Sequence, residues 1–492
     1  MLLGAAKYLA GSKNFRGTVH FIFQPAEEGG CGGDIMEKEG LILHQESSKR
    51  NRVNLARTAT TIIAVVVQIG FALPAKTHQL PLAEPESVSM SSEGLELLDT
   101  TMQSYIDSKM VAGTVSLVAR QGKVIHLKAQ GYRHIEENAA MTEDTIFVIM
   151  SMTKPIVSTA LMMLFEEGYF LLDDPISKYL PEFASKSVAV RTEGGVERVP
   201  SKHPITFRHV LTHTAGVDPS RRVISREERS LLRPRPTLEE TLVARAPLPL
   251  AFHPGDRWRY GSSTDYVALL VERVSGQRLD QFLQQRVFGP LGMVDTFYNV
   301  PASKVDRVSA VYSPSGPGNT IQLRGAPEIQ PPTSYFGGVA GLSSTAADYF
   351  RFAQMILNEG ELDGVRLLRP STVKLMITNH TGDMPVSGMG GAGFGFGLGF
   401  SMLTDPTRSR EGLTEGTFGW LGIWGTSFWI DPAEELISIL MMQITSYRHF
   451  NIRQDFARLA TSAITESFEL GLQDIRSYRS IERYATNSII QY

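Results

Sequence analysis

The sequence predicts an α/β fold of the α+β type, in which helices flank an antiparallel sheet that carries a mostly helical insertion. The stretch 114–129 consists of two β-rich runs around a hairpin signature at 120–122. The stretch 426–442 repeats this arrangement around a turn at 431–435. Strands near both ends of a domain, with helical patterns between them, are typical of an antiparallel sheet with N- and C-terminal helices.

Helical patterns with turn punctuation fill the middle of the chain, among them residues 263–274 and 279–288. Near the end, an apolar stripe predicts one last helix, with Ile452, Phe456, Leu459 and Ala463 on one face. The chain divides into a first segment, a signal-like segment with its linker, a long α/β domain and a tail, at residues 1–46, 47–84, 85–468 and 469–492.

Length and charge narrow the functional classes. With 492 residues, of which 42% are hydrophobic, the chain can bury a large core without disulfides or metals. The net charge of -3 supplies no general field for a phosphate backbone, so nucleic acid is not an expected partner. The single cysteine, Cys31, cannot form an intrachain disulfide, and this leaves the cellular compartment open.

An apolar stretch at residues 58–75 is too short for a comfortable membrane span, and no stable membrane anchor is expected. It is typical of an export signal, with basic residues before it and a possible cleavage site at Leu73-Pro74-Ala75. A buried apolar helix or strand is the alternative. We expect a native start near Val53, with a periplasmic or secreted protein if residues 53–75 are used, and a cytoplasmic one if translation starts at Met1.

The first segment, residues 1–46, resembles a piece of the metal-dependent aminoacylase and hippurate-hydrolase family of amidohydrolases. That resemblance implies a general base and a metal ligand at Glu27 and Glu28, after a strand at 19–23. A working site also needs further ligands on both sides of this pair. We therefore interpret the segment as a non-functional remnant, and we expect no metal and no cofactor.

The segment around Ser151 carries the first catalytic signal. Pro155 is tolerated only in the first turn of a helix, so Ser151 lies at or just before the helix N-terminus, where free backbone N–H groups could stabilise an oxyanion. Lys154 returns to the same face one turn later. The helix dipole and partial burial both favour a neutral amine there, able to accept the proton of the serine hydroxyl.

Further motifs occur in the order expected for one superfamily. The turn at 254–262 places Tyr260 before a helix, and 419–426 reads as a glycine-spaced strand. With His-Val-Leu-Thr-His-Thr-Ala-Gly at 209–216 and Gly-Gly-Val-Ala-Gly-Leu at 337–342, they resemble the serine β-lactamase and penicillin-binding-protein superfamily. The resemblance is strongest to the class C β-lactamase-like esterases called family VIII, and it implies a β-lactamase/transpeptidase-like fold.

Carried over to this chain, the resemblance implies that Ser151 is the nucleophile. Lys154 and Tyr260 would take its proton and later return one to the leaving group, and a phenol beside a cationic lysine would have its deprotonated form stabilised. The oxyanion hole would consist of the backbone N–H groups of Ser151 and of Ile423 on the edge strand.

Two departures bear on the substrate. Ser262 stands where the β-lactamases have an asparagine, and Trp420-Leu421-Gly422 stands where they have Lys-Thr-Gly. Trp420 replaces a fixed cation by a large apolar face, although Arg448 could supply a cation from elsewhere. With Ser262, Trp420 and Gly422 as substrate contacts, we expect an uncharged small-molecule ester as the substrate.

The main hypothesis is therefore a serine carboxylesterase acting on short- to medium-chain esters. An amidase, a weak β-lactamase or a D-peptidase on the same scaffold is the alternative, and a non-catalytic penicillin-recognising module is another. The chain contains no Gly-x-Ser-x-Gly elbow, and His209 and His213 lack the glutamate and third ligand of a zinc site. The Arg-rich run 221–235 is interpreted as a solvated loop, with the rim of a substrate entrance as the alternative.

Overall fold

The computed structural model describes residues 80–315, 320–325, 333–386, 393–409, 411–445 and 451–468. Contacts divide the chain into two units, Met1–Ala75 and Lys76–Tyr492, and every described residue lies in the second. The amidohydrolase-like segment, the signal-like stretch, Arg448 and the tail at 469–492 lie outside the described residues.

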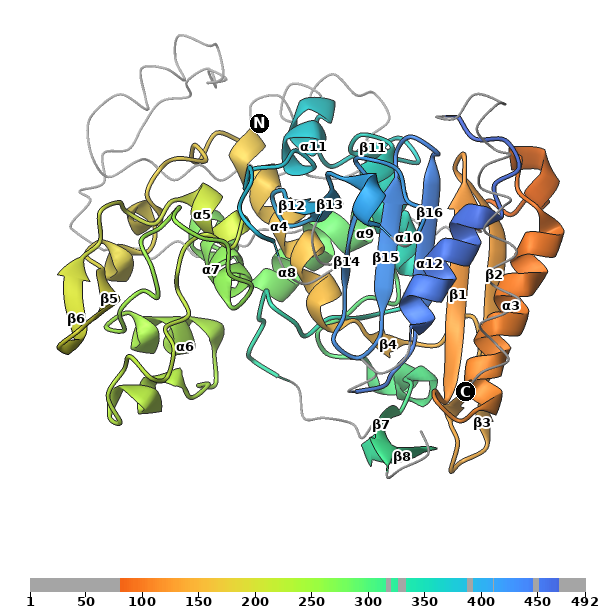
Figure 1. Ribbon diagram of the computed structural model, residues 1–492, viewed down its shortest axis with the longest axis horizontal. Coiled ribbons are helices and arrows are strands. Elements are labelled where there is room, and N and C mark those ends of the chain that lie inside the picture. Colours follow the sequence, from red (N-terminus) through yellow and green to blue (C-terminus); the bar gives the residue numbers. More distant parts are fainter. Residues whose placement is uncertain are drawn as a thin grey trace, which may run out of the picture. The chain divides into compact units, whose positions relative to one another are not determined.

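An eight-stranded antiparallel sheet forms the centre of the second unit (Figure 1), so the predicted α+β arrangement is confirmed. Its strand order is β12-β13-β14-β15-β16-β1-β2-β3, and strands from the two ends of the domain meet where β1 pairs with β16. The strands are β1 (Gly113–Arg120), β2 (Lys123–His134), β3 (Ala139–Ala140), β12 (Phe394–Phe396), β13 (Ser401–Leu403), β14 (Phe418–Leu421), β15 (Ser427–Asp431) and β16 (Leu436–Met441).

Both predicted hairpins form, and local turn chemistry accounts for them. In the β1–β2 turn, Gln121 and Gly122 have φ values of 52° and 71°, and positive φ at both central residues matches the twist of the flanking strands. In the β15–β16 turn, the Asp431 carboxylate accepts the backbone N–H groups of Ala433 and Glu434 at 3.1 and 3.2 Å.

Two helices cover one face of the sheet. The first, α3 (Ser92–Asp107), and the last, α12 (Ile452–Ser462), lie beside each other there (Figure 1). The predicted stripe on α12 is buried, since Phe456 and Leu459 pack in one cluster with Leu98 of α3 and with Val118 and Leu440 of the sheet. Burial of this apolar surface holds the two ends of the domain together.

The other face of the sheet and the insertion are mainly helical. α4 is buried along nearly its whole length and packs against α7, and α10 lies against β16 and β1.

Short hairpins pair β5 with β6, β7 with β8, and β10 with β11. The helices are α4 (Thr153–Glu166), α5 (Phe207–Leu211), α6 (Leu238–Arg245), α7 (Ser263–Ser275), α8 (Leu279–Leu283), α9 (Gly289–Leu291), α10 (Ala346–Leu357) and α11 (Pro370–Met376). The hairpin strands are β5 (Ser187–Thr192), β6 (Gly195–Pro200), β7 (Val311–Ser315), β8 (Thr320–Gly325), β10 (Glu361–Leu362) and β11 (Val365–Arg366).

One short strand pair joins distant parts of the sequence. β4 (Phe147–Val148) pairs with β9 (Ser343–Ser344), and the Ile149 N–H donates to the Leu342 carbonyl at 2.9 Å. This pairing brings the glycine-rich stretch 337–342 against the residues that lead into α4. The start of α4 is therefore held by strand pairing before the helix begins.

Candidate active site

Ser151 lies at the start of α4, as the position of Pro155 predicts. It belongs to the 3-10 turn η2 (Met150–Met152), which continues directly into the helix. Met150 has a φ of 48°, in the left-handed region that a non-glycine residue enters only when its surroundings enforce it. The chain therefore turns sharply just before Ser151.

The Lys154 amine lies against the Ser151 hydroxyl. Its Nζ is 3.1 Å from Ser151 Oγ and donates to the Val339 carbonyl at 2.9 Å. The side chain is 1% exposed, and burial lowers the pKa of Lys154 to about 7, although the nearby Asp265 and Asp218 carboxylates act in the opposite direction. A large share of the amine is thus neutral at pH 7 and can accept a proton.

Tyr260 approaches the same hydroxyl from the turn before α7. Its Oη donates to Ser151 Oγ at 2.7 Å, and Lys154 Nζ lies 4.6 Å from the centre of its ring. Burial raises the pKa of the Tyr260 phenol, while its hydrogen bonds with Ser151 and Trp420 act to lower it. The raised pKa favours a neutral phenol, and whether a cationic Lys154 stabilises the phenolate during the reaction stays a prediction.

The glycine-rich stretch supports Lys154 from the side of α7. The Val339 N–H donates to Asp265 Oδ1 at 3.0 Å, so the backbone of this one residue contacts both the buried Asp265 and the Lys154 amine. Gly338 fits tightly here, since a Cβ on it would lie 2.0 Å from the Thr264 carbonyl oxygen. Sequence reasoning missed Asp265, although an acidic residue in the first turn of an otherwise apolar helix was a usable signal.

Ile423 lies on a turn, and its predicted place on a strand is wrong. β14 ends at Leu421, and the next residues turn back, with the Gly422 N–H donating to the Thr426 carbonyl at 2.7 Å. Glycine is required at the turn, because a Cβ on Gly422 would lie 2.7 Å from the Ile149 carbonyl oxygen. Without a Cβ, Gly422 lets the turn pack closely against the residues just before Ser151.

β14 is an inner strand of the sheet, and only its last part is open. β13 pairs with Phe418 and Gly419, so among the described residues Trp420 and Leu421 have no strand partner on that side. The open edge predicted for this strand is therefore limited to Trp420 and Leu421. It lies next to the turn that carries Ile423, where a substrate could add to the strand.

Aromatic side chains surround Tyr260. The Trp420 indole N–H donates to Tyr260 Oη at 3.3 Å, and the two ring centres are 5.1 Å apart. The ring centre of His213 lies 5.0 Å from that of Tyr260, and Phe396 meets both Trp420 and His213 edge-on. Together with Trp258, these rings give the site an apolar wall.

The two histidines of the 209–216 motif do not converge on a metal. His209 Nδ1 accepts the Thr206 N–H at 3.1 Å and caps α5. His213 is buried, and burial lowers its pKa to about 3, with a smaller contribution from Lys154. Within the described ranges, no group of three or more His, Cys, Asp or Glu side chains is arranged to hold a metal ion.

No helix among the described residues is long and apolar enough to cross a bilayer.

Ser262 is already bound by a neighbouring carboxylate. Its backbone N–H donates to Asp218 Oδ2 at 2.7 Å, and its hydroxyl donates to Asp218 Oδ1 at 2.6 Å. The hydroxyl proton is therefore used within the protein, and the expected contact of Ser262 with the substrate stays a prediction. Sequence reasoning missed Asp218, because a single aspartate after the His-Thr-Ala-Gly motif does not reveal its partner.

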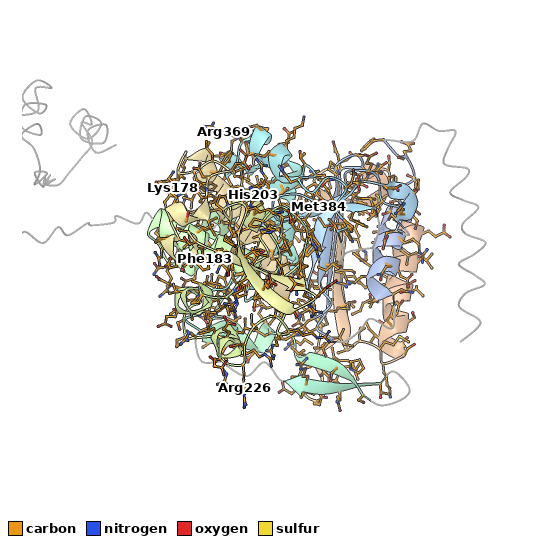
Figure 2. All side chains as sticks on the ribbon, turned by 60° about the vertical axis from the view of Figure 1, so that its left-hand side comes forward. Lys178, Phe183, His203, Arg226, Arg369 and Met384 are labelled. Atoms are coloured by element: carbon orange, nitrogen blue, oxygen red, sulfur yellow. The ribbon has the colours of Figure 1, made fainter. Side chains whose placement is uncertain are left out.

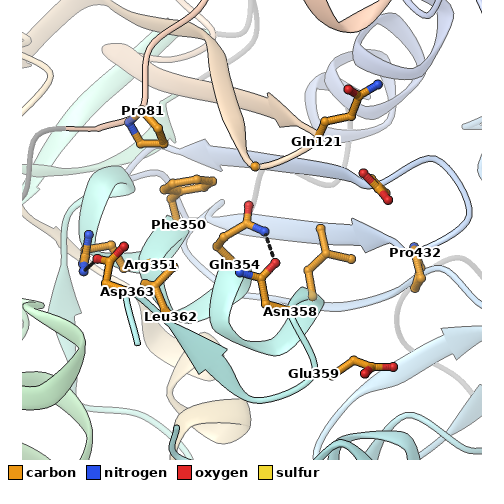
Figure 3. A pocket seen from close by; sticks show the side chains of 13 residues that line it. Pro81, Gln121, Phe350, Arg351, Gln354, Asn358, Glu359, Leu362, Asp363 and Pro432 are labelled. Carbon is orange, nitrogen blue, oxygen red and sulfur yellow. Dashed lines mark hydrogen bonds and ion pairs between the residues drawn. The ribbon is translucent and has the colours of Figure 1, made fainter. Parts of the chain in front are cut away.

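A cavity of about 850 Å³ lies elsewhere, between α10, the β1–β2 turn and the β15–β16 turn (Figure 3). It borders Pro432, just beyond the end of β15, whereas the turn with Ile423 precedes the start of that strand. In this cavity Gln354 donates to Asn358 at 2.7 Å and Arg351 pairs with Asp363. The cavity is thus separate from Ser151.

Comparison with known proteins matches residues 98–462 to the family model described as Beta-lactamase. The chain is 36% identical over 358 residues to Protein Rv1367c of Mycobacterium tuberculosis, covering 70% of this chain and 88% of that protein. It is 30% identical over 394 residues to Esterase EstB of Burkholderia gladioli, covering 74% and 94%. Among solved structures, EstCE1, a hydrolase with promiscuous acyltransferase activity, matches with a TM-score of 0.64 and 26% identity, covering 76% and 98%.

Proposed function

The chain belongs to the beta-lactamase family and is a serine hydrolase, and from this premise we propose that it is a carboxylesterase for small, uncharged esters. The proposed reaction runs through an acyl-enzyme on Ser151. The choice of ester rests on the Trp420 indole, which contacts Tyr260. By the family resemblance, Trp420 occupies the position of the lysine in the Lys-Thr-Gly motif of the β-lactamases.

In the first step, Ser151 Oγ attacks the ester carbonyl carbon while its proton passes to the neutral Lys154 amine, 3.1 Å away. The carbonyl oxygen becomes an oxyanion, which the backbone N–H groups of Ser151 and Ile423 would stabilise. The C–O bond then breaks, and the departing alkoxide takes a proton from Tyr260. Lys154 returns a proton to the phenol, so the acyl-enzyme forms with both groups neutral again.

Water completes the cycle by the same route. It loses a proton toward the Tyr260 and Lys154 pair as it attacks the acyl carbonyl carbon, and the resulting oxyanion collapses with release of Ser151 Oγ. The serine recovers its proton, and the products are one carboxylic acid and one alcohol. This step needs only the side chains that served the first one.

Two features favour an ester over an amide or a β-lactam. Trp420 brings an apolar ring where a charged carboxylate would need a cation. Ser262 is shorter than asparagine and spends its hydroxyl proton on Asp218, so it offers no donor to a substrate amide carbonyl. Ester alcohols also leave more readily than amines. The weak β-lactamase, amidase and D-peptidase alternatives therefore have less support.

A non-catalytic penicillin-recognising module is disfavoured by the contacts of Ser151. A hydroxyl that meets both a buried amine with a lowered pKa and a phenol is arranged for proton transfer, which mere recognition does not need.

The test compares initial rates on p-nitrophenyl butyrate for the wild type, Ser151→Ala and Ser158→Ala. Ser158 is a buried serine on the same helix and serves as the matched control. We expect Ser151→Ala to lose at least about 1000-fold in kcat, and Ser158→Ala to stay close to wild type. Full activity of folded Ser151→Ala would sink the proposal. Faster turnover of a chromogenic cephalosporin than of the ester would replace it by the β-lactamase alternative.

A further inference from the structure

A second concave site lies in the Arg-rich run of the insertion. Four arginine side chains line a pocket of about 400 Å³, together with Ser230, Leu232 and Pro234; they are Arg221, Arg226, Arg229 and Arg233. Arg226 is labelled in Figure 2, at the edge of the molecule in that view. We call this site the arginine pocket.

No carboxylate lines the arginine pocket, although Glu227 and Glu228 lie between Arg226 and Arg229 in the sequence. Its lining holds four guanidinium groups and no carboxylate, and none of the four forms an ion pair with another described residue. The neighbouring Arg198, by contrast, binds Glu228 at 2.6 Å. The whole chain has a net charge of -3, so this excess of positive charge is local. All four arginines are exposed, so water screens part of their mutual repulsion, and an anion bound between them would relieve the rest.

Hydrogen bonds hold the backbone of the arginine pocket in place. Arg229 Nε donates to the Arg221 carbonyl at 3.1 Å, which closes the segment on itself. Arg245 of α6 donates to the Leu232 carbonyl at 3.1 Å and ties the other end to the insertion. The arginines of the run are exposed, as expected for a solvated loop, and these hydrogen bonds give the loop a defined backbone.

We propose that the arginine pocket binds a small phosphorylated organic molecule. The guanidinium group presents parallel N–H donors that match two phosphate oxygens, so several of them around one cavity suit a multivalent oxyanion. Leu232 and Pro234 add apolar surface for an organic part. A cavity of this volume also exceeds the size of a bare phosphate.

The arginine pocket is linked to the turn that carries Tyr260 through Asp218, which lies close to it along the chain. Asp218, which binds Ser262, precedes Arg221 by three residues, a distance of at most about 11 Å between their Cα atoms. The ligand is nevertheless assigned to the pocket and not to the ester site. Binding can be measured without turnover, so this proposal and the carboxylesterase proposal fail independently.

Calorimetric titration of the full-length protein with phenyl phosphate and with inorganic phosphate tests the proposal. We expect saturable binding of phenyl phosphate, weaker binding of inorganic phosphate, and a marked loss of affinity in high salt. Arg226→Ala and Arg233→Ala should each weaken binding by about tenfold or more. Arg222→Ala is the matched control, because it removes the same charge from the same run outside the pocket lining, and it should change affinity less than about threefold.

Further measurements distinguish a ligand in the arginine pocket from a phosphate-bearing lipid surface. Arg226→Lys keeps the charge but lacks the parallel N–H donors of a guanidinium group, so it should give intermediate affinity. Melting temperatures show whether all variants are folded. Vesicles of phosphatidylcholine with phosphatidylglycerol form the second arm. Binding to these vesicles without binding of phenyl phosphate would overturn the proposal in favour of a lipid surface. Equal losses in Arg222→Ala and the pocket variants, or no saturable binding, would also overturn it.

Discussion

Asp218 holds Ser262 at two points, through the backbone N–H at 2.7 Å and the hydroxyl at 2.6 Å. The intervening Gly261 lies against the same carboxylate, where a Cβ would be 2.0 Å from Asp218 Oδ2. Ser262 follows Tyr260 by two residues, so the carboxylate fixes the turn from which the phenol reaches Ser151. Ser262 thus takes part in holding the turn that carries Tyr260.

Replacing Asp218 should therefore affect turnover more than replacing Ser262. We expect Asp218→Ala to lower kcat on p-nitrophenyl butyrate by about 10- to 100-fold with little change in KM, because the phenol loses its position. Ser262→Ala keeps the backbone hydrogen bond and should lose less than about fivefold. Steady-state kinetics of both variants, with circular dichroism as the folding control, measure this. A large rise in KM for Ser262→Ala alone would show that Ser262 contacts the substrate.

The pH dependence of ester hydrolysis should follow Lys154. Its pKa is lowered to about 7, and the protonated amine cannot accept the proton of Ser151, so kcat/KM should rise through pH 7 and level off above pH 8. The pKa of Tyr260 is raised and that of His213 is lowered to about 3, so neither titrates in this window. Rates from pH 5.5 to 9 on an ester with a non-ionising leaving group measure the profile.

Lys154→Arg is the control for this profile. A guanidinium stays protonated throughout the range, so the variant should be inactive at every pH measured. A flat wild-type profile between pH 5.5 and 8 would contradict the assignment of Lys154 as the base.

Trp420 should set the preference for uncharged substrates. Trp420→Phe keeps an apolar ring but removes the N–H that Tyr260 accepts, and we expect a loss of about three- to tenfold in kcat. Trp420→Lys should lower kcat/KM for p-nitrophenyl butyrate by at least about tenfold, while raising the rate on a carboxylate-bearing cephalosporin relative to that ester. The ratio of the two rates in each variant is the measurement. An unchanged ratio in Trp420→Lys would mean that this side chain does not contact the substrate.

Features with a local cause could be predicted from the sequence. The hairpin at Gln121 and Gly122 and the start of a helix at Pro155 follow from backbone preferences of a few residues. The pairing of β4 with β9 could not, because two-residue strands nearly 200 residues apart leave no periodic pattern. That pairing nevertheless delivers the Val339 carbonyl to Lys154.

The same distinction applies within the candidate site. Ser151 and Lys154 are one helical turn apart, so their contact was predictable from spacing. Asp218 binds Ser262 and Asp265 binds the Val339 N–H, and both partners lie far along the chain. Such pairings of a carboxylate could not be predicted from the sequence. The glycine spacing at 419–425 is typical of a strand interior and predicts a strand at Ile423, whereas the glycines form the tight turn after Leu421.

Burial of Lys154 should cost the protein stability near neutral pH. The amine has a pKa of about 7 in the folded protein against an ordinary value of 10.5, so between these values the unfolded chain binds a proton that the native state does not. Unfolding takes up this proton less readily as pH rises, and the free energy of unfolding of the wild type should increase from pH 7 toward pH 10.

Lys154→Met isolates this contribution, since methionine fills similar space without a charge. At pH 7 the variant should be more stable than the wild type by a few kcal/mol. The loss of the hydrogen bond to the Val339 carbonyl reduces this gain in stability. The difference in the free energy of unfolding should shrink by pH 9.5, because deprotonating the lysine then costs little free energy. Urea unfolding of both proteins at the two pH values measures the gap. A gap that does not change with pH would mean that the amine is charged and solvated in the folded protein, and the proton acceptor for Ser151 would have to be sought elsewhere.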